Sequence, residues 1–207
     1  YGQLGMSHHA TEEVAALRSF EHMRIYMPAD PVEAIAALND SYSYRGPSYI
    51  RLGRGNDAKI YEPGKEIDIT KAIKFYEKSD INIFASGTIL SEALTGVETL
   101  AKKDGNHIGL YSFPCVKPID SKTIASIAKE SKTIITVEEH STIGGFGSAV
   151  AEVVAELEGT RARVIRLGLD DKFTSVVGSQ NYLREHYGIS SDRLIDCITA
   201  LPKEGAN

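Results

Sequence analysis

Hydrophobic and polar positions divide the chain into two blocks that meet in a segment rich in glycine and charge. In the second block, apolar β-branched runs alternate with stretches whose apolar residues recur every three or four positions. The runs predict strands at Ile81–Ala85, Ile108–Tyr111, Thr133–Val137 and Val164–Leu167. Such alternation is typical of an α/β fold, with a mostly parallel sheet and helices on both of its faces.

Helices are predicted between and after these strands, because apolar residues there share one helical face. The faces consist of Leu90, Ala93, Leu94, Val97, Leu100 and Ala101, then Ile124, Ile127 and Ala128, then Ala149, Val150, Val153, Val154 and Leu157. A last helix, capped by Ser190 or Ser191, has Leu194, Ile198 and Leu201 on one face.

The first block, residues 1–65, predicts a helix after Thr11, a short strand at Arg24–Met27, a helix from Pro31 and a strand at Ser48–Leu52. Two helices and two strands bury too little surface to be stable alone. We therefore interpret this block as the tail of a larger α/β domain and residues 66–207 as a complete second domain.

Two local patterns in the first block predict where a helix begins and where a linker lies. Asp30 is a helix cap, Pro31 suits the first helical turn, and Glu33 completes a pattern like a capping box. Gly53–Lys65 is rich in Gly, Asn, Asp, Pro and charge, which predicts a linker between the two blocks.

Composition narrows the class of protein. The chain has 207 residues, of which 42% are hydrophobic and 25% charged, with a net charge of -5, and this balance argues against a nucleic-acid partner. No apolar stretch reaches the roughly 20 residues that span a membrane. Cys115 and Cys197 lack CxxC spacing and fit a reducing compartment, so we expect a cytoplasmic location. The chain begins at Tyr1 rather than at Met, so we expect an upstream segment.

The most informative stretch follows the strand at Thr133–Val137. The strand ends in Glu138, Glu139 and His140, and a turn with three glycines, Gly144–Gly147, precedes the next helix. Open α/β sheets present their chemistry at this carboxyl edge. The turn has neither a Walker ending nor a GxGxxG pattern, so close packing of the helix on the strand is the favoured interpretation.

Two histidines lie at a junction between a loop and a helix. His8 and His9 follow Ser7 and precede Thr11. Adjacent histidines form a poor metal chelate, and no HExxH pattern accompanies them, so we assign no metal ligand. A loop histidine beside a helix start is suited to hydrogen-bond a polar substrate or to move a proton, and an exposed histidine without function is the alternative.

Two arginines flank the end of the strand at Ser48–Leu52. Arg51 and Arg54 are expected to point to opposite faces, so that at most one of them faces a given pocket. Small neighbours around Arg54 allow a phosphate or carboxylate to approach its guanidinium. A surface ion pair is the alternative for either arginine.

Motifs along almost the whole chain carry a family resemblance. Two segments, Ser7–Ala34 and Gly46–Gly55, resemble the late part of a transketolase pyrimidine-binding domain. Four later segments resemble a transketolase C-terminal domain: Ala85–Leu94, Val116–Asp120, Val137–Glu156 and Arg166–Phe173. The pattern is most similar to split transketolases, in which the C-terminal half is a separate polypeptide.

The resemblance implies transfer of a two-carbon ketol unit between sugar phosphates in pentose phosphate metabolism, with thiamine diphosphate supplying the carbanion chemistry. By position, His9 matches the histidine that faces the substrate hydroxyls, and Arg54 matches the arginine that binds the sugar phosphate. His8 is a further substrate-binding candidate. Gly5 lies near the position where the family has an acidic residue that selects substrate stereochemistry, which leaves the sugar specificity open.

The resemblance also implies missing parts. The glutamate and aromatic residues that contact the aminopyrimidine ring precede Tyr1, and a separate domain holds the diphosphate with its Mg²⁺ or Ca²⁺. The chain is therefore expected to be inactive alone and to need an N-terminal transketolase section. We expect self-association, as a homodimer, through the C-terminal domain. The alternatives are a non-catalytic dimerisation module, or a section of a 1-deoxyxylulose-5-phosphate synthase or of a 2-oxoacid dehydrogenase β subunit.

Overall fold

The computed structural model describes residues 2–54, 58–104 and 107–202. The helices are η1 (Gly2–Leu4), α1 (Met6–His9), α2 (Glu13–Arg18), α3 (Pro31–Ser43), α4 (Leu90–Asp104), α5 (Ser121–Glu130), α6 (Phe146–Ala155), α7 (Gln180–His186) and α8 (Ser191–Thr199). The strands are β1 (Arg24–Tyr26), β2 (Ser48–Ile50), β3 (Ile73–Tyr76), β4 (Ile81–Ser86), β5 (Gly109–Ser112), β6 (Cys115–Lys117), β7 (Thr133–Ser141) and β8 (Arg163–Leu169).

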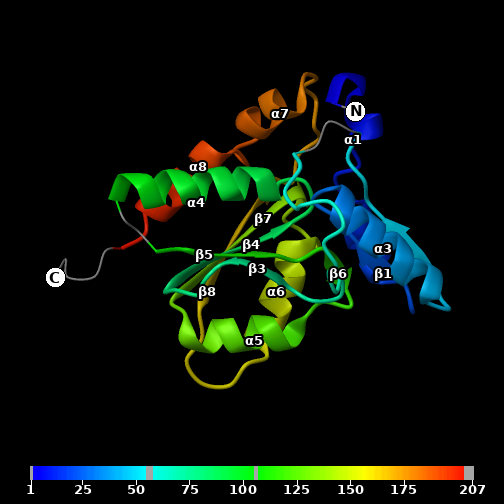
Figure 1. Cartoon of the computed structure of the whole chain (residues 1–207). Coiled ribbons are helices and arrows are strands. Elements are labelled where there is room, and N and C mark those ends of the chain that lie inside the picture. The colour runs from blue at the N-terminus through cyan, green and yellow to red at the C-terminus, as the bar shows by residue number, and fades with distance from the viewer. Residues whose placement is uncertain (1, 55–57, 105–106, 203–207) are drawn as a thin grey trace.

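A five-stranded sheet organises the second block in the order β3-β5-β4-β7-β8. The pairs β4–β5, β4–β7 and β7–β8 are parallel, and the edge strand β3 pairs antiparallel with β5. Helices α4 and α8 lie on one face of this sheet, and α5 and α6 lie on the other (Figure 1). The predicted α/β fold, with a mostly parallel sheet and helices on both faces, is confirmed.

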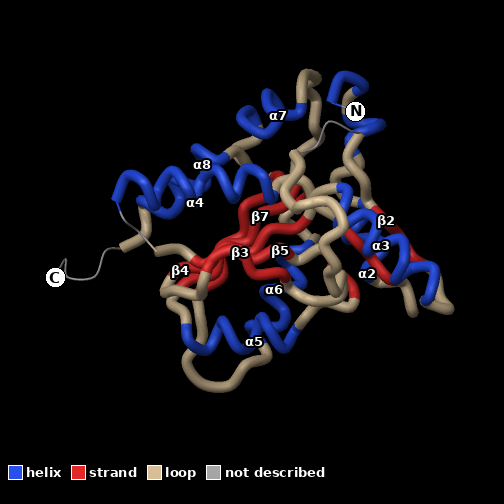
Figure 2. The backbone as a smooth tube through the Cα atoms, in the orientation of Figure 1, coloured by secondary structure: helices blue, strands red, loops and turns tan. Residues whose placement is uncertain are grey.

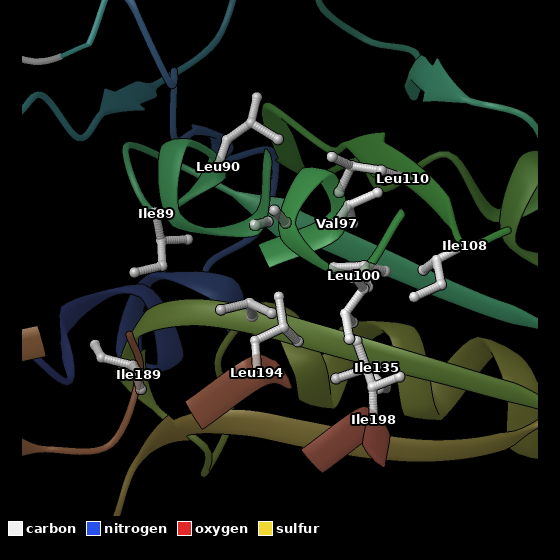
Figure 3. Close-up of a cluster of buried hydrophobic side chains, with 14 of the residues drawn as sticks. Ile89, Leu90, Val97, Leu100, Ile108, Leu110, Ile135, Ile189, Leu194 and Ile198 are labelled. Atoms are coloured by element: carbon white, nitrogen blue, oxygen red, sulfur yellow. The ribbon is translucent and has the colours of Figure 1, made fainter. Parts of the chain in front are cut away.

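The central strands are mostly apolar because helices cover both of their faces. Side chains of β4 and β7 that point toward α4 and α8 join one core, which includes Ile135, Leu194 and Ile198 (Figure 3). Side chains on the opposite face join a second core with α5 and α6, around Phe84 and Phe146. Runs rich in apolar β-branched residues therefore identified these strands correctly.

A second, three-stranded sheet has the order β2-β1-β6 and lies to one side of the large sheet (Figures 1 and 2). Strands β1 and β2 belong to the first block and pair in parallel. Strand β6 belongs to the second block and pairs antiparallel with β1, so that Tyr26 lies opposite Cys115. The two blocks thus share one sheet.

Part of the predicted linker is fixed to the first block by hydrogen bonds. The backbone N–H groups of Ile60 and Tyr61 donate to Asp30 Oδ2 at 3.1 and 3.0 Å, and the Tyr61 side chain is buried. Residues 55–57 of the predicted linker lie outside the described residues. The described remainder has no helix or strand, yet these contacts fix its course.

The start of α3 differs from the predicted capping box. Asp30 caps the helix as expected, accepting from the N–H groups of Val32 and Glu33. Glu33 accepts instead from Ala29 N at 2.6 Å, one residue before the cap, and from the hydroxyls of Tyr61 and Ser112. Its carboxylate is fully buried and joins the first block to β5.

The sequence patterns missed some elements and misplaced the ends of others. Strands β3 and β6 and helix α7 were not expected, because each is short and contacts distant parts of the chain, namely β5, β1 and Glu139. The predicted strand Ser48–Leu52 ends at Ile50, and the predicted strand Thr133–Val137 continues to Ser141. Ser190 caps the last helix, as one of the two predicted candidates.

Candidate functional site

The connections of the large sheet create a crevice at its carboxyl edge. Strand β4 leads to β5 on one side, while its other neighbour β7 leads to β8 in the opposite direction. Adjacent parallel strands whose connections diverge leave a crevice between their carboxyl ends, and ligands of α/β proteins bind in such crevices. Gly87 and Thr88 follow β4 at this point, and Glu139 lies on β7.

A cleft of about 480 Å³ opens over this crevice and is lined by both blocks. The first block contributes His8, His9, Arg51 and Arg54, and the second contributes Thr88, Glu139, Thr174, Gln180 and Arg184. The structure therefore brings together the three residues predicted for the site, His8, His9 and Arg54, and adds a wall from the second block. We refer to this space as the interblock cleft.

His9 is held at both of its ring nitrogens. It is the last residue of α1, which ends as Ala10 adopts a left-handed conformation with φ of 49°. Its Nε2 lies 3.2 Å from the carbonyl oxygen of Gly2, and its Nδ1 lies 2.9 Å from Thr174 Oγ1. A carbonyl oxygen only accepts hydrogen bonds, so Nε2 carries the hydrogen when the ring is neutral. His8 is exposed and contacts Ser7.

Arg51 and Arg54 both line the interblock cleft, so the expectation that at most one faces a given pocket is wrong. Strand β2 ends at Ile50, and the alternation of faces therefore does not extend to either arginine. Arg51 is fixed by a 2.8 Å ion pair with Glu13 and by donation to the carbonyl oxygens of Ala10 and Glu139. Arg51 therefore crosslinks the two blocks.

The wall from the second block is an ion-pair network. Arg184 is buried and donates to Glu139 at 2.7 Å, to Thr88 Oγ1 at 3.1 Å and to Glu92 at 3.4 Å. Burial alone raises the pKa of Glu139, but the charge and hydrogen bond of Arg184, together with Thr88 and Arg51, outweigh this effect and lower it. Gln180 donates to the same carboxylate at 3.0 Å. The network gives the wall fixed polar groups.

Glu138 and His140 lie behind this wall and are fully buried. The Glu138 carboxylate accepts from the backbone N–H groups of Phe146 at 2.6 Å and Gly147 at 2.8 Å, at the start of α6. Burial raises the pKa of Glu138 to about 7, against the opposing effect of these donors. His140 Nδ1 donates to the carbonyl oxygen of Ser141 at 2.8 Å, and burial lowers its pKa.

The glycine turn confirms the packing interpretation. A Cβ atom on Gly145 would lie 2.2 Å from Glu138 Oε2 and 2.6 Å from His140 Nδ1. A Cβ atom on Gly147 would lie 2.5 Å from Thr136 Oγ1. The turn is therefore glycine-rich because α6 begins directly against the buried end of β7.

Sequence reasoning missed Thr174, Gln180 and Arg184 as residues of the cleft. All three belong to the loop after β8 or to α7, which periodicity did not predict. A usable signal was present, since Ser179 precedes α7 and accepts from Tyr182 N as an N-cap.

The structure also bears on metals and membranes. Among residues 2–54, 58–104 and 107–202, no three side chains of the His, Cys, Asp and Glu types are grouped to hold a metal ion. No helix in the described part of the chain is both long and apolar enough to cross a membrane.

Two family models match the chain. The model described as "Transketolase, C-terminal domain" matches residues 71–194, and the model described as "Transketolase, pyrimidine binding domain" matches residues 1–58. Together they place both blocks, and hence both sides of the interblock cleft, within one known pair of domains.

Curated relatives agree with these models. The chain is 31% identical to a subunit of the apulose-4-phosphate transketolase of Actinobacillus succinogenes, over 97% of the chain and 64% of the relative. It is 33% identical to the 6-deoxy-6-sulfo-D-fructose transketolase subunit SqwH of a Clostridium species, over 92% of the chain and 58% of the relative. The chain thus spans less than two thirds of the length of these relatives.

A solved structure gives the same assignment. A structure described as a split gene transketolase, an inactive beta4 tetramer, superposes with a TM-score of 0.82 at 30% identity, covering 94% of this chain and 62% of the other. The transketolase of Leishmania mexicana, at 20% identity and a TM-score of 0.75, shares the fold.

Proposed function

The chain belongs to the transketolase family, and we propose that it is the C-terminal part of an enzyme that transfers a two-carbon ketol unit between sugar phosphates. Enzymes of this family depend on thiamine diphosphate, which supplies an electron sink for cleaving the carbon–carbon bond of the ketose. We assign residues 1–65 to the C-terminal part of a pyrimidine-binding domain and residues 66–207 to a transketolase C-terminal domain. The proposed location is cytoplasmic.

The observation that carries this proposal is the convergence of His8, His9 and Arg54 on the interblock cleft. These residues come from two separate segments and meet at the carboxyl edge of the sheet. Imidazole groups hydrogen-bond sugar hydroxyls, and a guanidinium binds phosphate through two parallel hydrogen bonds. The cleft therefore combines groups for both ends of a sugar phosphate.

Each proposed residue has a distinct role. Arg54 binds the substrate phosphate and thereby fixes the distance of the sugar from the reacting end. His9 is the catalytic histidine, and a substrate hydroxyl contacts it by taking the place of one of its two ring contacts. His8, which is exposed beside it, is a second substrate-binding group.

The described residues do not fit the divalent metal, because they contain no group of ligands that could hold it. We propose that an N-terminal transketolase section holds the metal and the diphosphate of the cofactor. Relatives named as subunits of apulose-4-phosphate transketolases support this division, since their names place them in enzymes of more than one subunit. The chain is then inactive alone.

Self-association is part of the proposal, in the form of a homodimer built through the C-terminal domain. The similar split gene transketolase is described as an inactive beta4 tetramer, which supports assembly of such chains without catalysis. The same observation supports the second candidate function, a non-catalytic assembly module. A synthase of 1-deoxy-D-xylulose 5-phosphate is a third candidate, because the chain is 33% identical to the Syntrophotalea carbinolica synthase over 92% of its length.

The test is steady-state kinetics of the chain assembled with its N-terminal section, using phosphorylated and unphosphorylated ketose donors. Arg54→Ala is expected to raise KM for the phosphorylated donor and to lower kcat/KM about 10- to 100-fold, because a charge-assisted contact is lost. The kcat/KM for the unphosphorylated donor is expected to change little. His9→Ala is expected to lower kcat/KM for both donors.

Arg45→Ala is the matched control, because Arg45 is an exposed arginine that is not among the residues lining the cleft. Equal kinetics for Arg54→Ala and Arg45→Ala would make Arg54 a surface residue. An assembled enzyme without ketol transfer, from any phosphorylated donor, would favour the assembly module.

A further inference from the structure

The loop that joins β8 to α7, residues 170–179, crosses from the C-terminal domain to the first residues of the chain. In Figure 1 this orange segment lies beside the blue N-terminal helices. The backbone N–H of Gly178 donates to the carbonyl oxygen of Gly2 at 3.0 Å, and Thr174 reaches His9. The loop therefore contacts the proposed catalytic histidine from a different domain.

The carbonyl oxygen of Gly2 determines which ring nitrogen of His9 carries the hydrogen, and the Thr174 hydroxyl complements that tautomer. Nε2 donates to the carbonyl oxygen of Gly2, so the neutral ring has its lone pair on Nδ1. The Thr174 hydroxyl, 2.9 Å away, donates to that lone pair. Thr174 is only 4% exposed, so water does not readily replace it as the donor.

The same loop holds the other side of the ring indirectly. The carbonyl oxygen of Gly2 accepts both His9 Nε2 and Gly178 N, which uses both of its lone pairs. A Cβ atom on Gly2 would lie 2.4 Å from the Gly178 carbonyl oxygen, so the backbone at Gly2 is in close contact with the loop at Gly178. One ten-residue loop therefore fixes the acceptor on one side of His9 and the donor on the other.

We propose that Thr174 is a positioning residue, which donates to Nδ1 of His9 and so holds the ring in its orientation at the interblock cleft. The inference rests on the proposed function for its catalytic consequence, but its structural content concerns this chain alone. It gives the C-terminal domain a direct part in the site. Without the Thr174 hydroxyl the ring would be held at Nε2 alone, so its orientation depends on this contact from the second domain.

The test is a heteronuclear NMR experiment on the chain, correlating the ring nitrogens with the carbon-bound ring protons at alkaline pH, where imidazole is neutral. The wild-type signal of His9, identified by its loss in His9→Gln, is expected to show a protonated Nε2 and an unprotonated Nδ1. Thr174→Val keeps the shape and removes the hydroxyl, so the unprotonated Nδ1 loses its hydrogen bond and its nitrogen shift should move. Thr174→Ser restores the donor and is expected to restore the wild-type shifts.

Ser175→Ala is the control, because Ser175 is the exposed neighbour in the same loop. In the assembled enzyme, Thr174→Val is expected to lower kcat/KM about tenfold, while Thr174→Ser and Ser175→Ala keep wild-type values. A wild-type His9 protonated at Nδ1, or identical shifts in Thr174→Val and wild type, would overturn the inference. An inactive assembly would instead refute the proposed function, and the nitrogen shifts would still decide the role of Thr174.

Discussion

Replacing Glu138 by glutamine should change how the stability of the chain depends on pH. Glu138 is fully buried, and burial raises the pKa of its carboxyl from 4.5 to about 7. As pH rises through this interval, the unfolded state releases the proton first, so the free energy of unfolding falls and then levels off above pH 7. The difference in pKa corresponds to about 3 kcal/mol.

The measurement is urea unfolding of wild type and Glu138→Gln at pH values from about 4.5 to 8. Glutamine does not titrate, so the stability of the variant relative to wild type should increase by about 3 kcal/mol across this range. A constant offset is also expected, because the glutamine side chain offers one acceptor where the carboxylate accepts from both Phe146 N and Gly147 N. Only the change of this offset with pH tests the reasoning.

Glu139→Gln is the matched control with the opposite sign. The pKa of Glu139 is lowered, because Arg184, Thr88 and Arg51 together outweigh the effect of burial. The stability that it contributes is present above its unfolded pKa and is lost as pH falls through the folded value. Curves for wild type and Glu138→Gln that stay parallel from pH 4.5 to 8 would refute the account of Glu138.

Two further predictions concern packing. Gly145→Ala should lower the free energy of unfolding by about 1–3 kcal/mol, because the new Cβ collides with Glu138 and His140, and chemical denaturation measures it. Leu194→Ala should cost about 2–5 kcal/mol in the same assay, because Leu194 fills the core between α4 and α8. A loss below about 1 kcal/mol would mean that the core around Leu194 collapses into the space.

Local sequence patterns determined most of the large sheet and its helices. Strands such as β4 are mostly apolar and rich in isoleucine, and α8 has both a serine cap and a periodic apolar face, so each element was readable from its own residues. Strand β6 was not readable, because Cys115–Lys117 becomes a strand only by pairing with β1. Glu33 was likewise misassigned to a capping box, since its partner Ser112 belongs to another block.

In the candidate site, too, local motifs could be read from the sequence, whereas contacts between distant segments could not. The motifs around His8, His9 and Arg54 identified those residues before any geometry was known. Their convergence on one cleft with Thr174 and Arg184 depends on how the two blocks pack, which no local pattern encodes. The error about Arg51 arose because a strand was extended by two residues beyond its end at Ile50.

The pairing of β1 with β6 has a consequence for synthesis on the ribosome. Strand β1 emerges before β6, but Tyr26 pairs with Cys115, so the second edge of β1 stays open until the chain has been extended well into the C-terminal domain. Unpaired strand edges recruit other strands and promote aggregation. The nascent chain therefore has an interval of vulnerability that ends when β6 is released, and slower translation between these strands should lengthen it.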